Sequence, residues 1–424
     1  MFLINYFVEH NRYLNILGIF VILGIAALFS RKRAHINYKL ILNALIMHFV
    51  IAFLVLRTSV GRQVIAAVAD MIKNLYLFAQ DGIQFVFGSL SNQQGPWGFI
   101  FAINVLPIII FFGALMSLLF HLGIIQRIVT VINYVVQPLL RTSGAETLCA
   151  IANSFLGQTE APLLIRHYIK NMTKSEIMVV MVSGMGTISG AILAVYAKMG
   201  VPVGHLLSAS VMAIPATILI AKILYPETEK PETIRGALIE PVEVPTSNVL
   251  DAISTGTCDG LQLALNVGAM LIAFLALIAM INAVLGYGAF FTNSFFVYMG
   301  LDWHVPALTL QYIFGIIFSP FGWLMGLNNG EIFKIGELIG IKVAINEMVA
   351  FTAMLNMQLS ERATMLVTYA LCGFSNFSCI GIQIGGIGVL APSKRQVLSE
   401  LGLYAVLGGT LANLLSAMVA GLLL

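Results

Sequence analysis

Charged side chains are scarce in this chain of 424 residues: Asp, Glu, Lys and Arg make up 10% of it, against 59% for apolar residues. A soluble domain carries about 25% charged residues. The mean hydropathy of +0.94 agrees with this shortage. Such a composition predicts an all-α polytopic protein embedded in membrane lipid.

Other missing features exclude several classes of function. The net charge is only +3 and no basic run stands among aromatic residues, so nucleic-acid binding is not expected. The four cysteines are far apart and form no CxxC spacing, which argues against a zinc site or a disulfide framework. A cleavable signal is not expected, because the basic cluster at 31–33 follows the first apolar run instead of preceding it.

Long apolar runs predict about eight transmembrane helices, since crossing a bilayer core takes about 20 residues. Residues 58–95 mix charged and apolar residues at helical spacing and predict an interfacial helix, and 287–304 is expected to loop outside. The prolines and glutamates of 226–249 predict a cytoplasmic linker, and the excess of Lys and Arg on that side sets the orientation. The predicted spans are 13–30, 40–56, 99–120, 177–197, 203–221, 261–283, 363–393 and 401–424.

Two further segments predict re-entrant hairpins. Residues 125–172 carry charges at both ends and an apolar middle, which favours two half-length helices folded back at Gly157. Residues 331–357, after a very apolar stretch at 308–327, resemble the first hairpin and have Glu347 midway. The first tip places Asn153, Gln158, Thr159 and Glu160 in apolar surroundings. At membrane depth such a cluster requires a cavity, an ion or a ligand.

The two halves of the chain follow one pattern. Each has a hairpin with a central Glu, a Ser-Glu foot, a broken span and a final span. Ser175-Glu176 pairs with Ser360-Glu361, and Glu160 pairs with Glu347, at a shift of about 185 to 187 residues. The breaks are expected at 183–190 and at 374–379, with a further break at the glycines after 379. Hairpins rooted on opposite sides make inverted repeats, which are typical of secondary transporters.

The residue types at the tips and breaks indicate what could bind. Gln158 both donates and accepts, Glu160 and Glu347 accept, and Asn376 can do either. An anionic substrate would favour Arg or Lys there, and none is present, so a neutral polyhydroxylated substrate is favoured. Phe374 could pack against a planar ring or belong to the core.

A small cation is the second candidate ligand. Asn153 and Thr187, with carbonyls freed near Leu156 and Ile188, form an all-oxygen set suited to a hard monovalent ion. The alternative is that the two polar residues only bond to backbone between packed helices.

Four motifs carry a resemblance to a known family: GQTEAPLL at 157–164, LALNVGAML at 263–271, NEMVAF at 346–351 and ALCGFSN at 370–376. They resemble the signatures of concentrative nucleoside transporters, and the resemblance runs from about residue 13 to the end. It implies a bacterial inner-membrane homotrimer in which a scaffold holds a mobile transport domain. That domain would contain both hairpins and carry a uridine-like nucleoside across by an elevator movement, coupled to sodium.

The resemblance also implies roles for single residues. Gln158, Thr159 and Glu160 would contact the base, with Ile192 nearby and Phe374 lining the site. Glu347, Asn376 and residue 379 would hold the ribose. Family members usually have Ser where this chain has Cys379, and a thiol is the weaker hydrogen-bonding group. Some relatives use protons, but Asn153 and Thr187 favour sodium. The residues that would hold sodium are Asn153, Leu156, Thr187 and Ile188.

The predicted spans, hairpins and linker divide the chain into domains. A scaffold is expected to draw on 1–125 and 256–303, two repeats on 126–225 and 304–424, and a linker on 226–255. The rival from another class is an intramembrane enzyme using Glu160 and Glu347 as acid and base, although no HExxH or GxSxG motif supports it. The third hypothesis for the function is a gradient-driven carrier of some other neutral metabolite.

Overall fold

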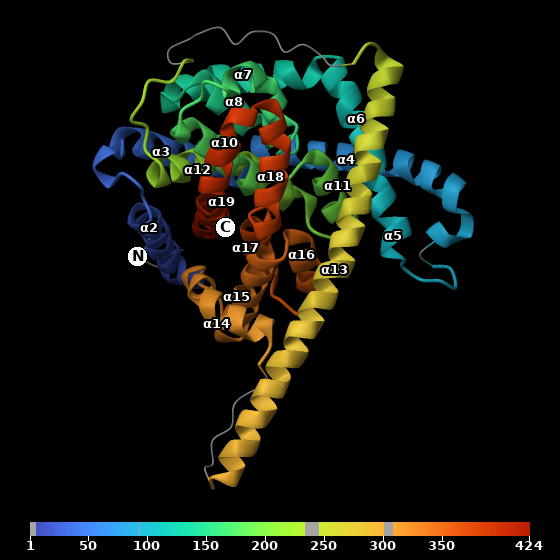
Figure 1. Ribbon diagram of the computed structural model, residues 1–424, viewed down its shortest axis with the longest axis vertical. Coiled ribbons are helices and arrows are strands. Elements are labelled where there is room, and N and C mark those ends of the chain that lie inside the picture. The colour runs from blue at the N-terminus through green and yellow to red at the C-terminus, as the bar shows by residue number, and fades with distance from the viewer. Residues whose placement is uncertain (1–5, 93, 234–245, 301–307) are drawn as a thin grey trace.

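The computed structural model describes residues 6–92, 94–233, 246–300 and 308–424, and every regular element within them is a helix (Figure 1). Seven helices are long and apolar enough to cross a membrane, or up to eight if a pair bent by 120° is counted as one span. The prediction of an all-α chain with about eight spans is therefore confirmed. The seven are Tyr6–Leu28, Tyr38–Arg57, Phe101–His121, Lys174–Met199, Val203–Leu224, Val249–Tyr298 and Pro392–Leu423.

The N-terminal elements are two spans followed by an amphipathic helix. Helix α2 (Arg12–Leu28) and helix α3 (Tyr38–Arg57) are the first two spans. Helix α4 (Ser59–Phe87) is amphipathic and runs across the others in Figure 1, as expected of a helix in the membrane interface. The short α5 (Phe101–Asn104) leads into the third span.

The rest of the chain repeats one order of elements. The first copy comprises α6 (Leu106–His121), α7 (Ile124–Leu140), α8 (Gly144–Ala152), η4 (Ala161–Ile165) with α9 (Arg166–Ile169), α10 (Lys174–Gly186), α11 (Gly190–Met199) and α12 (Val203–Leu224). The second comprises α13 (Val249–Tyr298), α14 (Leu310–Leu324), α15 (Asn329–Ala344), α16 (Glu347–Leu355), α17 (Glu361–Leu371), α18 (Phe377–Leu390) and α19 (Arg395–Leu423). In Figure 1, α7 and α8 lie at the upper end and α14 and α15 at the lower end, so the hairpins enter from opposite sides.

The repeat corrects one predicted pairing. Helix α10 begins at Lys174 and α17 at Glu361, and 361 less 174 gives 187, the separation of Glu160 from Glu347. Thr173, the N-cap of α10, therefore corresponds to Ser360, the N-cap of α17. The predicted match of Ser175-Glu176 with Ser360-Glu361 is two residues out of register. Both caps accept a backbone N–H three residues on, which is why a hydroxyl residue stands at each start.

Three predicted boundaries were wrong. The first hairpin begins at Gly144, not at 125, because α7 is a separate helix that buries one face only (Ile125, Val129, Val136 and Leu140). Of the outer loop predicted at 287–304, residues 287–298 instead continue α13, since no proline interrupts its 50 residues, and 301–304 lie outside the described residues. The glycines after 379 do not break α18; an added Cβ at Gly386 would lie 3.1 Å from Thr159 Cβ, so this glycine admits the first hairpin tip.

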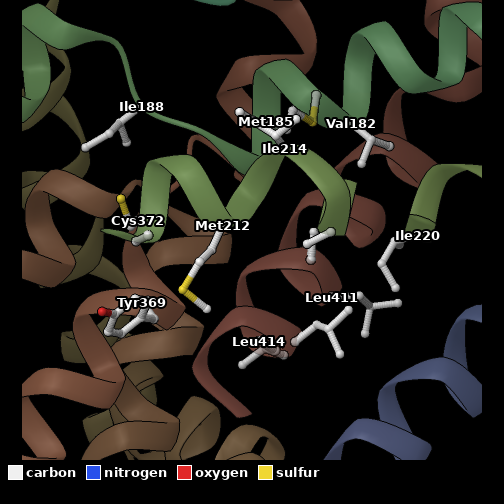
Figure 2. Close-up of a cluster of buried hydrophobic side chains, with 14 of the residues drawn as sticks. Val182, Met185, Ile188, Met212, Ile214, Ile220, Tyr369, Cys372, Leu411 and Leu414 are labelled. Carbon is white, nitrogen blue, oxygen red and sulfur yellow. The ribbon is translucent and has the colours of Figure 1, made fainter. Parts of the chain in front are cut away.

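Burial divides the helices into two groups. The most apolar stretches of α10–α11, α12 and α19 are 94%, 89% and 83% buried, whereas that of α13 is 6% buried. Side chains such as Met185, Met212, Tyr369 and Leu411 pack between these inner helices (Figure 2). At a rise of about 1.5 Å per residue, α13 is about 75 Å long, far more than a bilayer core of about 30 Å. It leaves an extended apolar surface uncovered.

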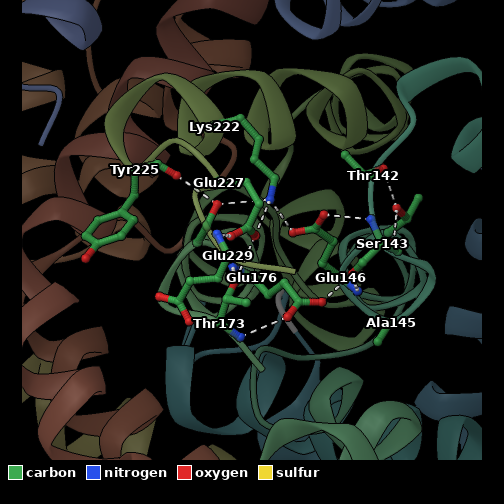
Figure 3. Close-up of polar contacts among 12 residues, drawn as sticks. Thr142, Ser143, Ala145, Glu146, Thr173, Glu176, Lys222, Tyr225, Glu227 and Glu229 are labelled. Carbon is green, nitrogen blue, oxygen red and sulfur yellow. Dashed lines mark hydrogen bonds and ion pairs between the residues drawn. The ribbon is translucent and has the colours of Figure 1, made fainter. Parts of the chain in front are cut away.

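Polar contacts fix the base of the first hairpin (Figure 3). Ser143 caps α8, and its hydroxyl donates to Glu176 Oε1 in α10 at 2.6 Å. Lys222 Nζ of α12 forms an ion pair with Glu146 Oε2 at 2.7 Å, and both side chains are buried. Thr173 Oγ1 donates to Glu227 Oε2 at 2.8 Å, which joins the start of the linker to the start of α10. The hairpin base is thus joined to α10 and α12.

Glycines bring α6 and α13 into backbone contact. A Cβ added at Gly256 would lie 2.6 Å from the Gly113 carbonyl oxygen, and one added at Gly260 would lie 2.8 Å from Ile110 Cα. Such close approach is how helices associate where lipid supplies no hydrophobic driving force.

We expect Gly256→Leu to lower the free energy of unfolding by about 1–3 kcal/mol, the usual cost of forcing extra atoms into a packed contact. The measurement is the thermal unfolding midpoint in detergent. Gly286→Leu in the same helix is the matched control, because no atom of the described residues lies within 4 Å of a Cβ added there. Equal midpoints for the two variants would contradict this packing.

Candidate functional site

The first hairpin tip is a non-helical turn between α8 and η4. Helix α8 ends at Ala152, and η4 starts with Pro162 in its first turn, where a missing N–H costs nothing. Within the tip, Glu160 Oε2 accepts the backbone N–H of Gly157 at 3.0 Å. The carboxylate therefore holds the turn closed while its side chain stays exposed.

The second tip is shorter. Helix α15 ends at Ala344, and Asn346 caps α16 by accepting the N–H of Val349 at 2.9 Å. Glu347 is the first residue of α16, so its carboxylate lies at the positive end of that helix. Its two oxygens accept from Tyr196 Oη at 2.8 Å and from Asn376 Nδ2 at 3.1 Å.

The break between α17 and α18 completes the polar set. Asn376 Oδ1 caps α18 by accepting the N–H of Cys379 at 3.0 Å. Cys379 Sγ in turn accepts from Gln158 Nε2 at 3.3 Å, while Gln158 Oε1 is buried without a hydrogen-bond partner in the described part of the chain. Hairpin tips and a helix break from both halves of the sequence thus meet at one place.

These groups line a cavity of about 620 Å³, within the usual range for small-molecule sites. The facing wall consists of α6 and α13, and the cavity reaches Thr246 in the linker, on the side expected to be cytoplasmic. No Lys or Arg is among its described lining residues. All eight residues predicted to bind substrate line it, and their roles as ligands stay a prediction: Gln158, Thr159, Glu160, Ile192, Glu347, Phe374, Asn376 and Cys379.

The four residues predicted to hold sodium are all buried. Asn153 Nδ2 donates to Ser183 Oγ at 2.9 Å, and its Oδ1 is buried with no hydrogen-bond partner among the described residues. Thr187 and Ile188 stand in the break between α10 and α11, and Leu156 stands in the first tip. The Gly190 N–H donates to Phe155 O at 3.0 Å and so joins tip to break. An acceptor oxygen left without a donor beside a helix break fits a small cation.

Sequence reasoning missed several lining residues. Tyr196, which lies behind the lining and donates to Glu347, was missed as well, and it gives no local signal because it lies in an apolar span. Asp259, Gln262 and Asn266 line the α13 wall, and Gln262 Nε2 donates to Asn266 Oδ1 at 3.0 Å. Their spacing of three and four puts them on one helix face, a signal that could have found them.

Cys379, at the start of α18, gives a direct test of the predicted ribose contacts. We expect Cys379→Ser to bind uridine about two- to tenfold more tightly, because a hydroxyl forms hydrogen bonds worth about 0.5–1.5 kcal/mol where a thiol forms weaker ones. The measurement is the KM for uridine uptake. Cys258→Ser on the exposed surface is the control. An unchanged KM would place residue 379 outside the ribose contacts.

Comparison with known proteins identifies the family. The chain matches "Na+ dependent nucleoside transporter N-terminus" over residues 17–90, "Nucleoside recognition" over 102–203 and "Na+ dependent nucleoside transporter C-terminus" over 205–421. It is 39% identical to nucleoside permease NupC of Helicobacter pylori, over 96% of this chain and 97% of that protein. It is 46% identical to an uncharacterised transporter of Haemophilus influenzae, over 96% and 97% of the two chains.

Solved structures agree. The fold is similar to CNTnw in an inward-facing substrate-bound state, with a TM-score of 0.88, 39% identity, and coverage of 98% of this chain and 99% of that one. A variant of CNTnw in an outward-facing state matches with a TM-score of 0.88 and 38% identity over 97% of each chain. Solved states that face opposite sides indicate alternating access in this fold. The chain therefore belongs to the concentrative, Na+-dependent nucleoside transporters, a family of multi-pass membrane transporters and not of enzymes.

Proposed function

We propose that this protein imports nucleosides into the cell by symport with sodium. The observation that carries the proposal is that two hairpin tips and a helix break converge on one cavity that is polar and has no described Lys or Arg in its lining. Next to it lies a buried oxygen of Asn153 that has no hydrogen-bond partner among the described residues. A neutral substrate with many hydroxyl groups and a small cation fit that combination.

Hydrogen-bonding capacity divides the cavity into a base end and a ribose end. Gln158 Nε2 donates to Cys379 Sγ, and Gln158 Oε1 has no hydrogen-bond partner among the described residues. This side chain therefore offers the donor and acceptor pair that a nucleobase edge needs. Glu347 and Asn376 form a bonded pair whose remaining lone pairs and N–H suit ribose hydroxyls. Thr159, Glu160, Ile192 and Phe374 complete the lining.

The cation would be held where the first tip meets the α10–α11 break. Asn153 Oδ1, the Thr187 hydroxyl and the carbonyls of Leu156 and Ile188 supply hard oxygen ligands, and sodium bound there would add positive charge beside the nucleoside site. Those residues lie in or next to segments whose helical bonds are interrupted, so the backbone has oxygens to offer. This favours sodium over the proton as the coupling ion.

The burial pattern supports an elevator movement. The hairpins pack with α10, α12 and α19, and in this proposal that body moves along a scaffold built on α6 and α13. The apolar surface of α13 suits membrane lipid and two further copies in a homotrimer. The cavity reaches the linker side, which corresponds to an inward-facing arrangement in the bacterial inner membrane.

Reconstitution tests the function. Purified protein in liposomes should accumulate labelled uridine, unchanged, when sodium is higher outside than inside. An imposed proton gradient alone should not drive accumulation. Uptake that is driven by a proton gradient and does not depend on sodium would identify the proton as the coupling ion. Chemical conversion of the labelled uridine would favour the enzyme alternative. Stronger competition against uridine uptake by another neutral metabolite than by nucleosides would point to that metabolite as the substrate.

A further inference from the structure

Lys342 is a buried lysine that neither the nucleoside site nor the sodium site uses. It lies near the end of α15, five residues before Glu347, and its side chain is 0% exposed. Its Nζ donates to Ala370 O at 2.8 Å and to Asn413 Oδ1 at 2.7 Å. Both acceptors are neutral, and no described carboxylate forms an ion pair with it. Lysine side chains are almost never fully buried unless they are paired with an opposite charge, so this arrangement points to a role beyond packing.

Asn413 of α19 extends this contact to both broken spans. Its Nδ2 donates to Gly186 O at 2.8 Å, at the end of α10, and to Cys372 O at 2.9 Å, just after α17. These carbonyls are among those that lose their helical partners where the helices stop. One side chain therefore bonds to the break beside Thr187 and to the break beside Phe374.

The two breaks also touch each other. A Cβ added at Gly373 would lie 2.9 Å from Met185 O and would overlap Asn413 Oδ1. The Phe374 N–H donates to Thr187 O at 3.2 Å. A shift of the α10–α11 break is therefore passed to the α17–α18 break by rigid backbone contact, not through a compressible layer of side chains.

We propose that Lys342 and Asn413 are positioning residues that transmit sodium occupancy at the α10–α11 break to the nucleoside site, and so set how strongly sodium raises nucleoside affinity. Sodium draws the carbonyls next to Gly186 toward itself. A shift of Gly186 moves Asn413 through their hydrogen bond, and Asn413 moves Cys372 in the same way. Lys342 bonds Asn413 to the second hairpin, which contains Glu347. This inference rests on the proposed sodium-coupled function and names how that coupling is carried.

The test is the factor by which sodium lowers the Kd of uridine, measured on purified protein in sodium and in choline at equal ionic strength. Coupled sites typically show factors of about 5 to 150. In Lys342→Met, which keeps the length and volume but loses both hydrogen bonds, we expect that factor to fall toward one. Lys334→Met on the same helix, where the amine donates to Gln358 O in an exposed hydrogen bond, should keep the wild-type factor.

A second variant guards against misfolding of the first. Asn413→Asp keeps the volume and the acceptor for Lys342 but loses the donors to Gly186 and Cys372, and we expect the same fall. By linkage, the effect of uridine on sodium affinity must fall equally. Both variants keeping the wild-type factor, or weakening uridine binding equally with and without sodium, would overturn the inference. A wild-type protein without any sodium effect would instead refute the proposed coupling.

Discussion

Replacing Glu347 with Gln is expected to reduce uridine uptake at least about a hundredfold, since bonds to a charged acceptor are worth about 1.5–3 kcal/mol each. Glu347 accepts from Tyr196 and Asn376 with separate oxygens, so an amide must turn its NH2 toward one of these donors. That loses a bond and displaces Asn376, which caps α18. The measurement is initial uptake by liposomes containing equal amounts of protein.

Glu361→Gln is the control for this prediction. Glu361 is exposed at the first position of α17, in the same repeat, and lines no part of the cavity. It should transport normally. Monodisperse elution and an unchanged unfolding midpoint would show that Glu347→Gln is folded. Wild-type uptake by a folded Glu347→Gln protein would remove this carboxylate from the substrate site.

Asn153→Ala is expected to raise the sodium concentration for half-maximal uptake about tenfold or more, because the cation loses one oxygen ligand and even changes at groups that support a metal ligand cost about 10–100-fold in affinity. The buried Oδ1 without a described partner is the group removed. The measurement is uridine uptake against sodium at constant ionic strength. Uridine affinity at saturating sodium should change much less.

Asn171→Ala is its matched control, because Asn171 is exposed and bonds to Glu232 at the surface. An unchanged sodium curve in Asn153→Ala would take this residue out of the ion site. A lower maximal rate without a shift along the sodium axis would have the same meaning, since it would show a defect in movement and not in cation binding.

The sequence predicted those parts of the molecule whose signals are local. Gly157 and Pro162 with polar neighbours located the first tip, and the equivalent polar residues near Glu347 located the second. Apolar runs located the spans. Helix ends were less well predicted where no breaker was present: α13 continues through 287–298, and α18 continues through its glycines. An amphipathic helix such as α7 was merged with the hairpin that follows, because its buried face is as apolar as a half-span.

The contacts that sequence reasoning missed join residues far apart in the chain. Tyr196 reaches Glu347, Lys342 reaches Asn413, and Gln158 reaches Cys379. None of these pairs shares an element or a periodic pattern. The first and the last depend on how the two repeats cross, and the second depends on how α15 packs against α19 within one repeat. Asp259, Gln262 and Asn266 differ from these pairs, because their spacing of three and four residues in the sequence predicts a shared polar helix face.

The bonds at the base of the first hairpin have a consequence for how the site opens. Ser143, Glu146 and Lys222 join α8 to α10 and α12. The first hairpin is therefore expected to move together with α10 and α12, and not as an independent gate. A covalent staple between its base and α12 should therefore leave the transport cycle intact. A staple between its tip and the facing α13 should halt the cycle.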